Sequence, residues 1–235
     1  MVKVIILSLH DSPRREVITK RLKKRGIDDF EFYNAFDARN MDMSELEQLF
    51  DVKKFRETYG RNPARGEIGC TLSHLGIWKY IAESEYYNWI VLEDDAILTP
   101  WFNVLFLENN FPDDLTLIGY SKVSFLRGAA NNIRHFLFGS NIEKTTNKKL
   151  YTIGKNKKEN WGFGTVSYCI TKKTAKELKQ LTENNPYFLT DDFDIYESII
   201  NVNHVRPFLV YEDFKSMVSN IEKDRAKLRK NGSRR

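Results

Sequence analysis

The sequence predicts an α/β protein with a mainly parallel central sheet flanked by helices. Apolar runs rich in β-branched residues recur along the chain, as in strands that are buried on both faces. Segments of helical periodicity separate most of these runs, and strands that alternate with helices favour a parallel sheet. The chain has 235 residues, of which 41% are apolar and 29% charged. This composition and length suit a globular protein with a large core.

The first half of the chain begins with a strand over residues 2–9. Pro13 suits the first turn of the following helix, and Gly26 can adopt the left-handed conformation that ends it. Further on, Ser44 has capping-box spacing to Glu47 and opens a short helix. The remaining elements of this half are a strand over 30–36, that short helix over 44–54, and a helix over 67–85 with one apolar side.

The second half alternates in the same way around one long irregular segment. Residues 124–160 are rich in Asn, Lys and Gly and weakly periodic, so we expect a substrate lid or an acceptor-binding insertion there. Thr171 or Thr174 opens a helix. Strands are expected over 89–92, 115–120, 165–170 and 205–210, with a further helix after Pro100. We expect a single catalytic domain over residues 1–214.

Several classes of protein are disfavoured by what the sequence lacks. No apolar stretch reaches the roughly 18 residues that span a bilayer, and the N-terminus lacks the features of a signal peptide. Cys70 and Cys169 lie inside apolar patterns, which favours reduced thiols and a cytoplasmic protein. The glycine-rich dinucleotide turn, the P-loop, the nucleophile elbow and the His-Glu-x-x-His zinc motif are all missing. Carboxylates and arginines are therefore the candidate catalytic groups.

Positive charge is concentrated in a tail over residues 215–235. Lys and Arg outnumber acids there, within a chain of net charge +5. Such a tail could hold the protein against an anionic membrane surface, or it could be a solvated terminus. No helix-turn-helix, RNP or zinc-finger pattern is present, so we expect no nucleic-acid partner.

Three acids end the apolar strand over residues 89–92: Glu93, Asp94 and Asp95. Burying three carboxylates together is costly, because like charges and desolvation both oppose ionisation. A crevice at the carboxyl end of the strand, with Mg²⁺ or Mn²⁺ bound, would relieve that cost. Strand alternation places Glu93 and Asp95 on one side and Asp94 on the other. The alternative is an exposed turn or a helix cap.

Taken in order, these residues resemble a known family. The matching blocks are residues 5–15 (IILSLHDSPRR), 36–38 (FDA), 66–78 (GEIGCTLSHLGIW), 91–95 (VLEDD), 164–171 (GTVSYCIT) and the pair Asp191-Asp192. They resemble the bacterial lipooligosaccharide galactosyltransferases of glycosyltransferase family 25, whose animal relatives glycosylate collagen. The resemblance covers nearly the whole chain. It implies a GT-A type fold, a UDP-sugar donor, a divalent ion that is usually Mn²⁺, and inversion to give a β-linkage.

The resemblance also implies roles for the acids. Asp95 and then Asp94 would hold the metal, which neutralises charge on the leaving UDP, and Glu93 with Asp94 would contact the ribose and diphosphate. An inverting transfer needs a base for the acceptor hydroxyl, and Asp191 is the candidate with Asp192 in reserve. A metal contact is the rival role for Asp191. By residue type alone, Asp191 could instead cap a helix over residues 193–200.

Five further residues are candidates for the donor site. Arg14 and Arg15 follow the first strand and could clamp a uracil carbonyl or a phosphate, or could be solvated on a basic helix face. Gly66 and Glu67 open the long helix and could line the donor pocket, although Glu67 could simply pair with Arg65. His74 is either a donor-site residue or a hydrogen-bonded core histidine. Trp161, followed by flexible Gly162, could stack on a sugar ring.

The expected function is therefore that of a metal-dependent hexosyltransferase. The resemblance implies transfer of galactose, or secondarily glucose, from a UDP-hexose to a lipooligosaccharide or other glycan acceptor. Such an enzyme would work in the cytoplasm, with peripheral contact to the inner face of the bacterial plasma membrane through the basic tail. Two other functions use the same acids. One is a metal-dependent nucleotidyltransferase or phosphohydrolase, and the other is a non-catalytic module that binds nucleotide sugars.

Overall fold

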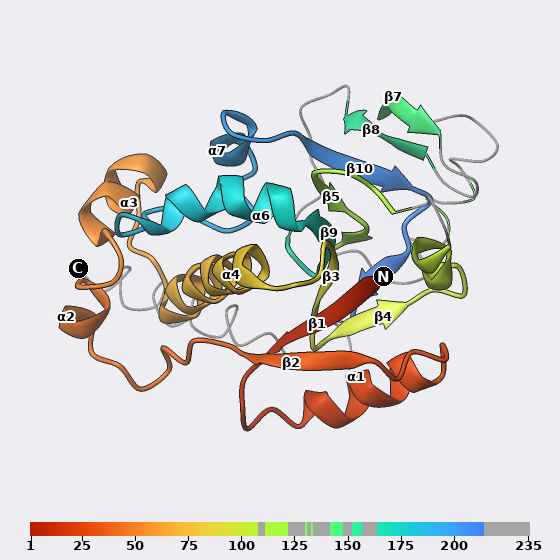
Figure 1. Ribbon diagram of the computed structural model, residues 1–235. Helices are drawn as coiled ribbons and strands as arrows, with labels where there is room; N and C mark the ends of the chain where they lie inside the picture. The colour runs from red at the N-terminus through yellow and green to blue at the C-terminus, as the bar shows by residue number, and fades with distance from the viewer. Residues whose placement is uncertain are drawn as a thin grey trace.

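The central sheet of the protein, seen in a computed structural model, has eight strands (Figure 1). The structure describes residues 1–107, 111–121, 130, 133, 142–147, 152–156 and 164–213. Across the sheet the strands lie in the order β2-β1-β3-β9-β5-β10-β8-β7. Their bounds are β1 Val2–Ser8, β2 Phe30–Asn34, β3 Asn88–Glu93, β5 Leu115–Leu117, β7 Ile142–Asn147, β8 Thr152–Asn156, β9 Ser167–Thr171 and β10 Val202–Arg206.

The strand directions confirm the α/β class and show that the sheet is mixed. β2, β1, β3, β5, β10 and β7 run in one direction, and β9 and β8 run in the other. The strands are thus mainly co-directional, but β9 lies antiparallel between β3 and β5. An apolar run does not encode strand direction, so the sequence could not predict this reversal. As a result, the start of β9 lies beside the carboxyl end of β3.

Helices cover both faces of the sheet (Figure 1). Val4 and Ile6 of β1 pack with Ile18 and Leu22 of α1 (Arg14–Lys23), whereas the alternate residues of β1 pack with α4 (Arg65–Glu83) on the other face. The alternation follows from the period of two along a strand. The face of α4 is completed by α6 (Lys172–Leu178), η2 (Lys179–Thr182) and α7 (Asp194–Glu197).

A small second sheet places the end of the described chain beside the turn that follows β3. Its order is β4-β11-β6, with β4 Ala96–Leu98, β11 Val210–Glu212 and β6 Gly119–Tyr120. β11 pairs antiparallel with β4, so that Glu212 lies opposite Ala96. The backbone N–H of Asp213 then donates to the carbonyl of Asp95, with an N···O distance of 3.0 Å.

Some element boundaries differ from those predicted. The helix expected over 44–54 is two helices, α2 (Met43–Leu46) and α3 (Val52–Tyr59). Asp42, and not Ser44, opens α2 in a capping box with Glu45, and the side chain of Asp51 accepts from Lys54 N to start α3. Two acids of strong capping tendency thus divide one predicted helix. The helix expected after Pro100 is a 3₁₀ helix, η1 (Phe102–Phe106).

The predicted strands over 115–120 and 205–210 are each divided between the two sheets, as β5 and β6 and as β10 and β11. The segment 124–160, predicted as an irregular insertion, contains the β7–β8 hairpin at the far end of the sheet. Apart from residues 130 and 133, the rest of that segment lies outside the described residues, as do Trp161, Gly162 and the basic tail. Among the helices that the structure describes, none is long and apolar enough to cross a membrane.

Candidate functional site

The three acids after β3 lie at the carboxyl edge of the sheet, as predicted. Glu93 is the last residue of β3, and Asp94 and Asp95 form the turn to β4. The turn is buried: Asp94 is 8% and Asp95 is 7% exposed. β1 pairs directly with β3, so its carboxyl end and the start of α1 lie beside this turn. The exposed-turn alternative is therefore wrong.

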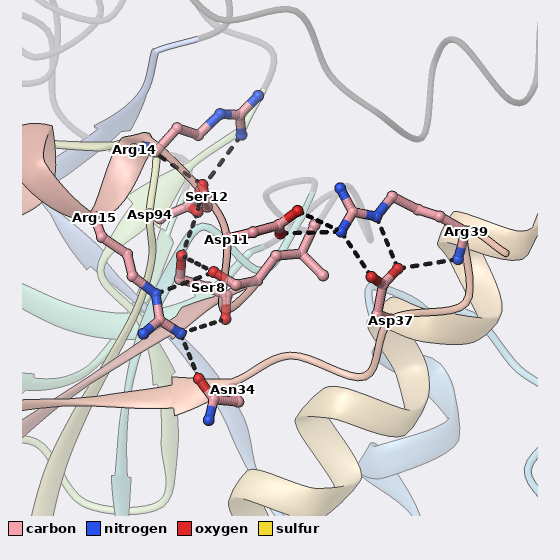
Figure 2. A network of polar contacts seen from close by, with 10 residues as sticks. Ser8, Asp11, Ser12, Arg14, Arg15, Asn34, Asp37, Arg39 and Asp94 are labelled. Carbon is pink, nitrogen blue, oxygen red and sulfur yellow. Dashed lines mark hydrogen bonds and ion pairs between the residues drawn. The ribbon is translucent and has the colours of Figure 1, made fainter.

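Asp94 is held by groups from β1 and α1. The hydroxyls of Ser8 and Ser12 both donate to its Oδ2, at 2.7 and 2.8 Å. A guanidinium nitrogen of Arg14 lies 3.4 Å from Oδ1. Figure 2 shows Ser8, Ser12 and Arg14 gathered around this carboxylate. The sequence analysis missed the two serines as site residues, since a hydroxyl near a strand end carries no specific signal.

Asp95 has a carboxylate oxygen without a partner. Its Oδ2 lies 3.3 Å from Arg14, but Oδ1 is buried and has no hydrogen-bond partner among the described residues. Burial raises the pKa of Asp95 well above its usual range, and the charges of Glu93 and Glu212 raise it further, whereas Arg14 lowers it. A carboxylate oxygen left bare among other acids is the environment that a hard divalent cation such as Mg²⁺ or Mn²⁺ would satisfy. The donor set therefore fits a metal.

Glu93 is directed toward α4 and β9. Thr165 donates to its Oε1 at 2.7 Å, and the Nε2 of His74 lies 3.7 Å from the same oxygen. Burial raises the pKa of Glu93, but His74 and Thr165 outweigh it, so the pKa is lowered. Glu93 thus has different partners from Asp94 and Asp95, which share Arg14. The strand ends at Glu93, and Asp94 and Asp95 belong to the turn that follows, so the placement of Glu93 and Asp95 on one side stays a prediction.

Arg14 and Arg15 have separate roles in this structure. Arg14 reaches the acids, whereas Arg15 donates to the carbonyls of Leu9 and Ser8 and to Asn34. Its guanidinium also lies over the ring of Phe32, 4.7 Å from the centroid. Figure 2 shows Arg15 directed toward the ends of β1 and β2, away from Arg14. Arg15 ties these strands together, so only Arg14 lies where it could meet a ligand beside the acids.

A second cluster in Figure 2 extends the same edge of the sheet. Arg39 bridges Asp11, in the loop after β1, and Asp37, in the segment after β2. These side chains are about half exposed, at 43%, 65% and 41%. Such pairs contribute little stability individually. They connect two loops at the carboxyl edge of the sheet.

Arg21 and Asp213 hold the backbone of the turn through hydrogen bonds to its carbonyl groups. Arg21 donates to the carbonyls of Asp95 and Ala96, at 3.3 and 2.9 Å, and forms an ion pair with Asp213. Arg21 was not among the residues predicted to belong to the site. No local pattern pairs residues 192 positions apart, so the sequence offered no signal for this contact.

The late acids Asp191 and Asp192 lie in the loop before α7. The hydroxyl of Tyr59 donates to Asp192 and accepts from the backbone N–H of Leu189. The carboxylates of Asp191 and Glu93 both raise the pKa of Cys70, after the larger effect of burial, which places that thiol near both acids. The N-cap of α7 is Phe193, without a side-chain hydrogen bond among the described residues. The capping alternative for Asp191 is therefore wrong.

Gly66 and Glu67 lie in the first turn of α4. Glu67 is 3% exposed and accepts from both terminal nitrogens of Arg61, at 2.7 Å each, and from the backbone N–H of Ala64. Arg65, the predicted partner, donates instead to the carbonyl of Met41. These contacts begin the helix and fix the preceding loop. Nothing in them leaves an oxygen of Glu67 directed at the acid crevice.

His74 is a fully buried residue of α4. Its Nδ1 is 2.9 Å from the hydroxyl of Tyr168, which also accepts from the indole N–H of Trp78. Its Nε2 is directed toward Glu93. The prediction of a buried core histidine is confirmed, although the ring also approaches Glu93, and the donor-site role stays a prediction.

The geometry defines a class of protein before any comparison. A buried carboxylate turn with an arginine, at the carboxyl edge of an α/β sheet, is the kind of site that binds a cation and an anionic ligand. Residues 1–195 match the model of glycosyltransferase family 25 (LPS biosynthesis protein). The chain belongs to this family.

Three relatives match the chain over different lengths. A protein of Haemophilus influenzae named "Putative glycosyltransferase" is 28% identical over 209 residues, 87% of this chain and 63% of that protein. A mimivirus glycosyltransferase-like protein, R655, is 25% identical and covers 74% of this chain and 51% of its own length. Human procollagen galactosyltransferase 2 is 33% identical over 86 residues, 35% of this chain and 14% of that protein. The chain therefore spans less than two thirds of these relatives.

Among solved structures, similarity is distant. An inositol-1-phosphate CTP transferase from T. maritima is 17% identical with a TM-score of 0.43, and covers 97% of this chain and 96% of that one. A glycosyltransferase involved in glycosylation of the major capsid of PBCV-1 is 8% identical with a TM-score of 0.40, and covers 97% and 98%.

Proposed function

We propose that this chain is an inverting hexosyltransferase that moves galactose, or secondarily glucose, from a UDP-sugar to a lipooligosaccharide or other glycan acceptor. The observation that carries the proposal is the buried carboxylate turn, with the bare Oδ1 of Asp95 beside Arg14. Membership of glycosyltransferase family 25 supports transfer of a sugar. The similarity to procollagen galactosyltransferases supports galactose.

The donor would lie along the carboxyl edge of β1 and β3. Asp95 and Asp94 would hold Mn²⁺ or Mg²⁺, which when bound supplies positive charge opposite the leaving diphosphate. Arg14 lies 3.3 and 3.4 Å from these two acids and can donate to a phosphate oxygen on the same side. Ser8 and Ser12 fix the carboxylate of Asp94, so the site needs little reorganisation when the donor binds.

The acceptor would meet Asp191 or Asp192. Inversion requires one group that takes the proton of the attacking hydroxyl. Asp192 already accepts a hydrogen bond from the hydroxyl of Tyr59, so one of its carboxylate oxygens is occupied. We therefore assign the base to Asp191, and the Tyr59–Asp192 pair would position the loop.

The test is release of UDP from a panel of UDP-sugars, with Mn²⁺ or with EDTA. We expect UDP from UDP-galactose, or failing that from UDP-glucose, and none with EDTA. Asp191→Asn should lower transfer to an added glycan at least 100-fold and leave UDP affinity unchanged, whereas Asp192→Asn should have the smaller effect. Equal effects of the two variants would contradict the assignment of the base.

Two rival functions give different products in the same assay. A nucleotidyltransferase would release pyrophosphate and a phosphohydrolase phosphate, in place of UDP. A non-catalytic module would bind UDP-sugars without turnover, and Asp191→Asn would then change nothing. The proposal also places the enzyme in the cytoplasm, where residues 215–235 would bind the inner face of the bacterial plasma membrane. It predicts that deletion of this basic segment reduces binding to anionic vesicles while UDP release persists.

A further inference from the structure

Three potential metal ligands meet behind the acid turn. Cys70 and His74 are four residues apart on α4, and therefore lie on the same face of that helix, opposite Glu93 at the end of β3. The thiol sulfur, one imidazole nitrogen and one carboxylate oxygen all lie within 4.8 Å of one another. Within this group, His74 Nε2 and Glu93 Oε1 are 3.7 Å apart. The distance is too long for a hydrogen bond.

The imidazole of His74 is arranged as that of a metal-binding histidine usually is. Its Nε2 is buried and has no hydrogen-bond partner in the part of the chain that the structure describes. The other nitrogen, Nδ1, lies 2.9 Å from the hydroxyl of Tyr168. Trp78 fixes that hydroxyl in turn, at 3.0 Å. Metal-ligating histidines characteristically donate the second ring N–H to a fixed acceptor, and with its proton on Nδ1 His74 would donate in this way to the hydroxyl of Tyr168.

We propose that Cys70, His74 and Glu93 form a second metal site, distinct from the Asp94–Asp95 cation site, and that it binds Zn²⁺. Sulfur and imidazole ligands select zinc, whereas the all-oxygen ligands of Asp94 and Asp95 select Mg²⁺ or Mn²⁺. Ligand atoms on a tetrahedral zinc ion are roughly 3.3 to 3.8 Å apart, from bond lengths of about 2.0 to 2.3 Å. The His74–Glu93 separation already falls in that range.

When Zn²⁺ binds, it replaces the thiol proton of Cys70. Zn²⁺ forms a bond to the sulfur of Cys70, the S–H bond breaks, and the proton leaves to solvent. Glu93 and Asp191 both act electrostatically on this thiol. A dication beside it compensates the negative charge of both acids. The fourth position remains for water or a substrate atom, as in zinc sites with three protein ligands.

The test uses the full chain, stripped with a chelator and titrated with Co²⁺ as a spectroscopic substitute for Zn²⁺. We expect a thiolate-to-cobalt charge-transfer band in the near ultraviolet that Zn²⁺ removes by competition. Cys70→Ser should abolish the band. Cys169→Ala is the matched control, because the other thiol is buried in β9 away from this group, and it should leave the band intact. Circular dichroism confirms that each variant is folded.

Two further variants separate this site from the donor site and from a purely structural role. Asp95→Asn should keep the band, since Asp95 belongs to the other site. Tyr168→Phe removes one hydroxyl from the support of His74 and should weaken Zn²⁺ binding about 10- to 100-fold. Cobalt binding without a thiolate band, a band that survives in folded Cys70→Ser, or a band lost in Asp95→Asn would each overturn the proposal.

Discussion

Two regions of this protein bury a carboxylate, and their partners differ. At the first turn of α4, Glu67 is 3% exposed and both of its oxygens are occupied by Arg61, with Ala64 N as a third donor. At the turn after β3, Asp95 is 7% exposed, its Oδ1 has no hydrogen-bond partner among the described residues, and Arg14 approaches only its Oδ2. Glu67 and Asp95 are buried to a similar extent. Among the described residues, both oxygens of Glu67 accept hydrogen bonds, whereas Oδ1 of Asp95 accepts none.

The difference separates structural from functional acids. A buried carboxylate with its hydrogen bonds made contributes to stability, whereas one left bare among like charges costs stability. Such a cost persists in a protein when a ligand removes it or when catalysis uses it. Both residues are acids within family-like motifs, so the motif alone did not distinguish them.

The largest expected effect follows from the bare carboxylate. Asp95→Asn should lower UDP release at least 1,000-fold, because it would remove the proposed cation ligand. It should also raise the melting temperature without added metal, because it removes a charge that burial, Glu93 and Glu212 disfavour. Steady-state kinetics and calorimetry measure the two effects. Asp28→Asn, at an exposed position, is the control. A loss of stability in Asp95→Asn would contradict the comparison.

The next largest effects are expected at the two arginines, on activity for Arg14 and on stability for Arg15. Arg14→Gln should reduce UDP release about 100-fold with little change in stability, since its contacts to the acids are long, at 3.3 and 3.4 Å. Arg15→Gln should lower the melting temperature and change activity less, because its partners are carbonyls and Asn34. Similar profiles for the two variants would show that this division is wrong.

Glu67→Gln should act mainly on stability. It exchanges the charged acceptor of Arg61 and Ala64 N for a neutral amide, which should cost about 2 kcal/mol of unfolding free energy. The KM for the UDP-sugar should stay within twofold of the native value. Urea denaturation together with donor kinetics makes this measurement. An increase in KM at unchanged stability would instead support the donor-site role that the sequence predicted for Glu67.

The smallest effect is expected at a hollow far from the acid turn. A cavity of about 540 Å³ lies at the amino end of β1 and β3, lined by residues that include Lys3, Tyr80 and Tyr86. Two of its charged groups are paired, since Lys3 lies 2.5 Å from Asp29 and also lies over the ring of Tyr86. Tyr80→Ala should therefore leave UDP release within twofold. A larger loss in a folded variant would make this hollow a second substrate site.

The sequence by itself determined most of the framework and the identity of the main acids. Hydrophobic periodicity located β1, β3, α1 and α4, Gly26 ended α1 in the left-handed conformation at φ 71°, and Thr171 capped α6. It also placed Glu93, Asp94 and Asp95 at a strand end. These features are local: periodicity, capping and turn preferences act within a few residues of the chain.

Only the tertiary structure decided which polar groups meet. It reversed β9, which brought Thr165 to Glu93, and it paired Arg21 with Asp213 and Ser8 with Asp94. It also distinguished Arg14 from Arg15, and Asp95 from Glu67. The physical reason is that a hydrogen bond or an ion pair depends on approach within a few ångströms. Residues far apart in the sequence reach that distance only after the sheet order and strand directions are set.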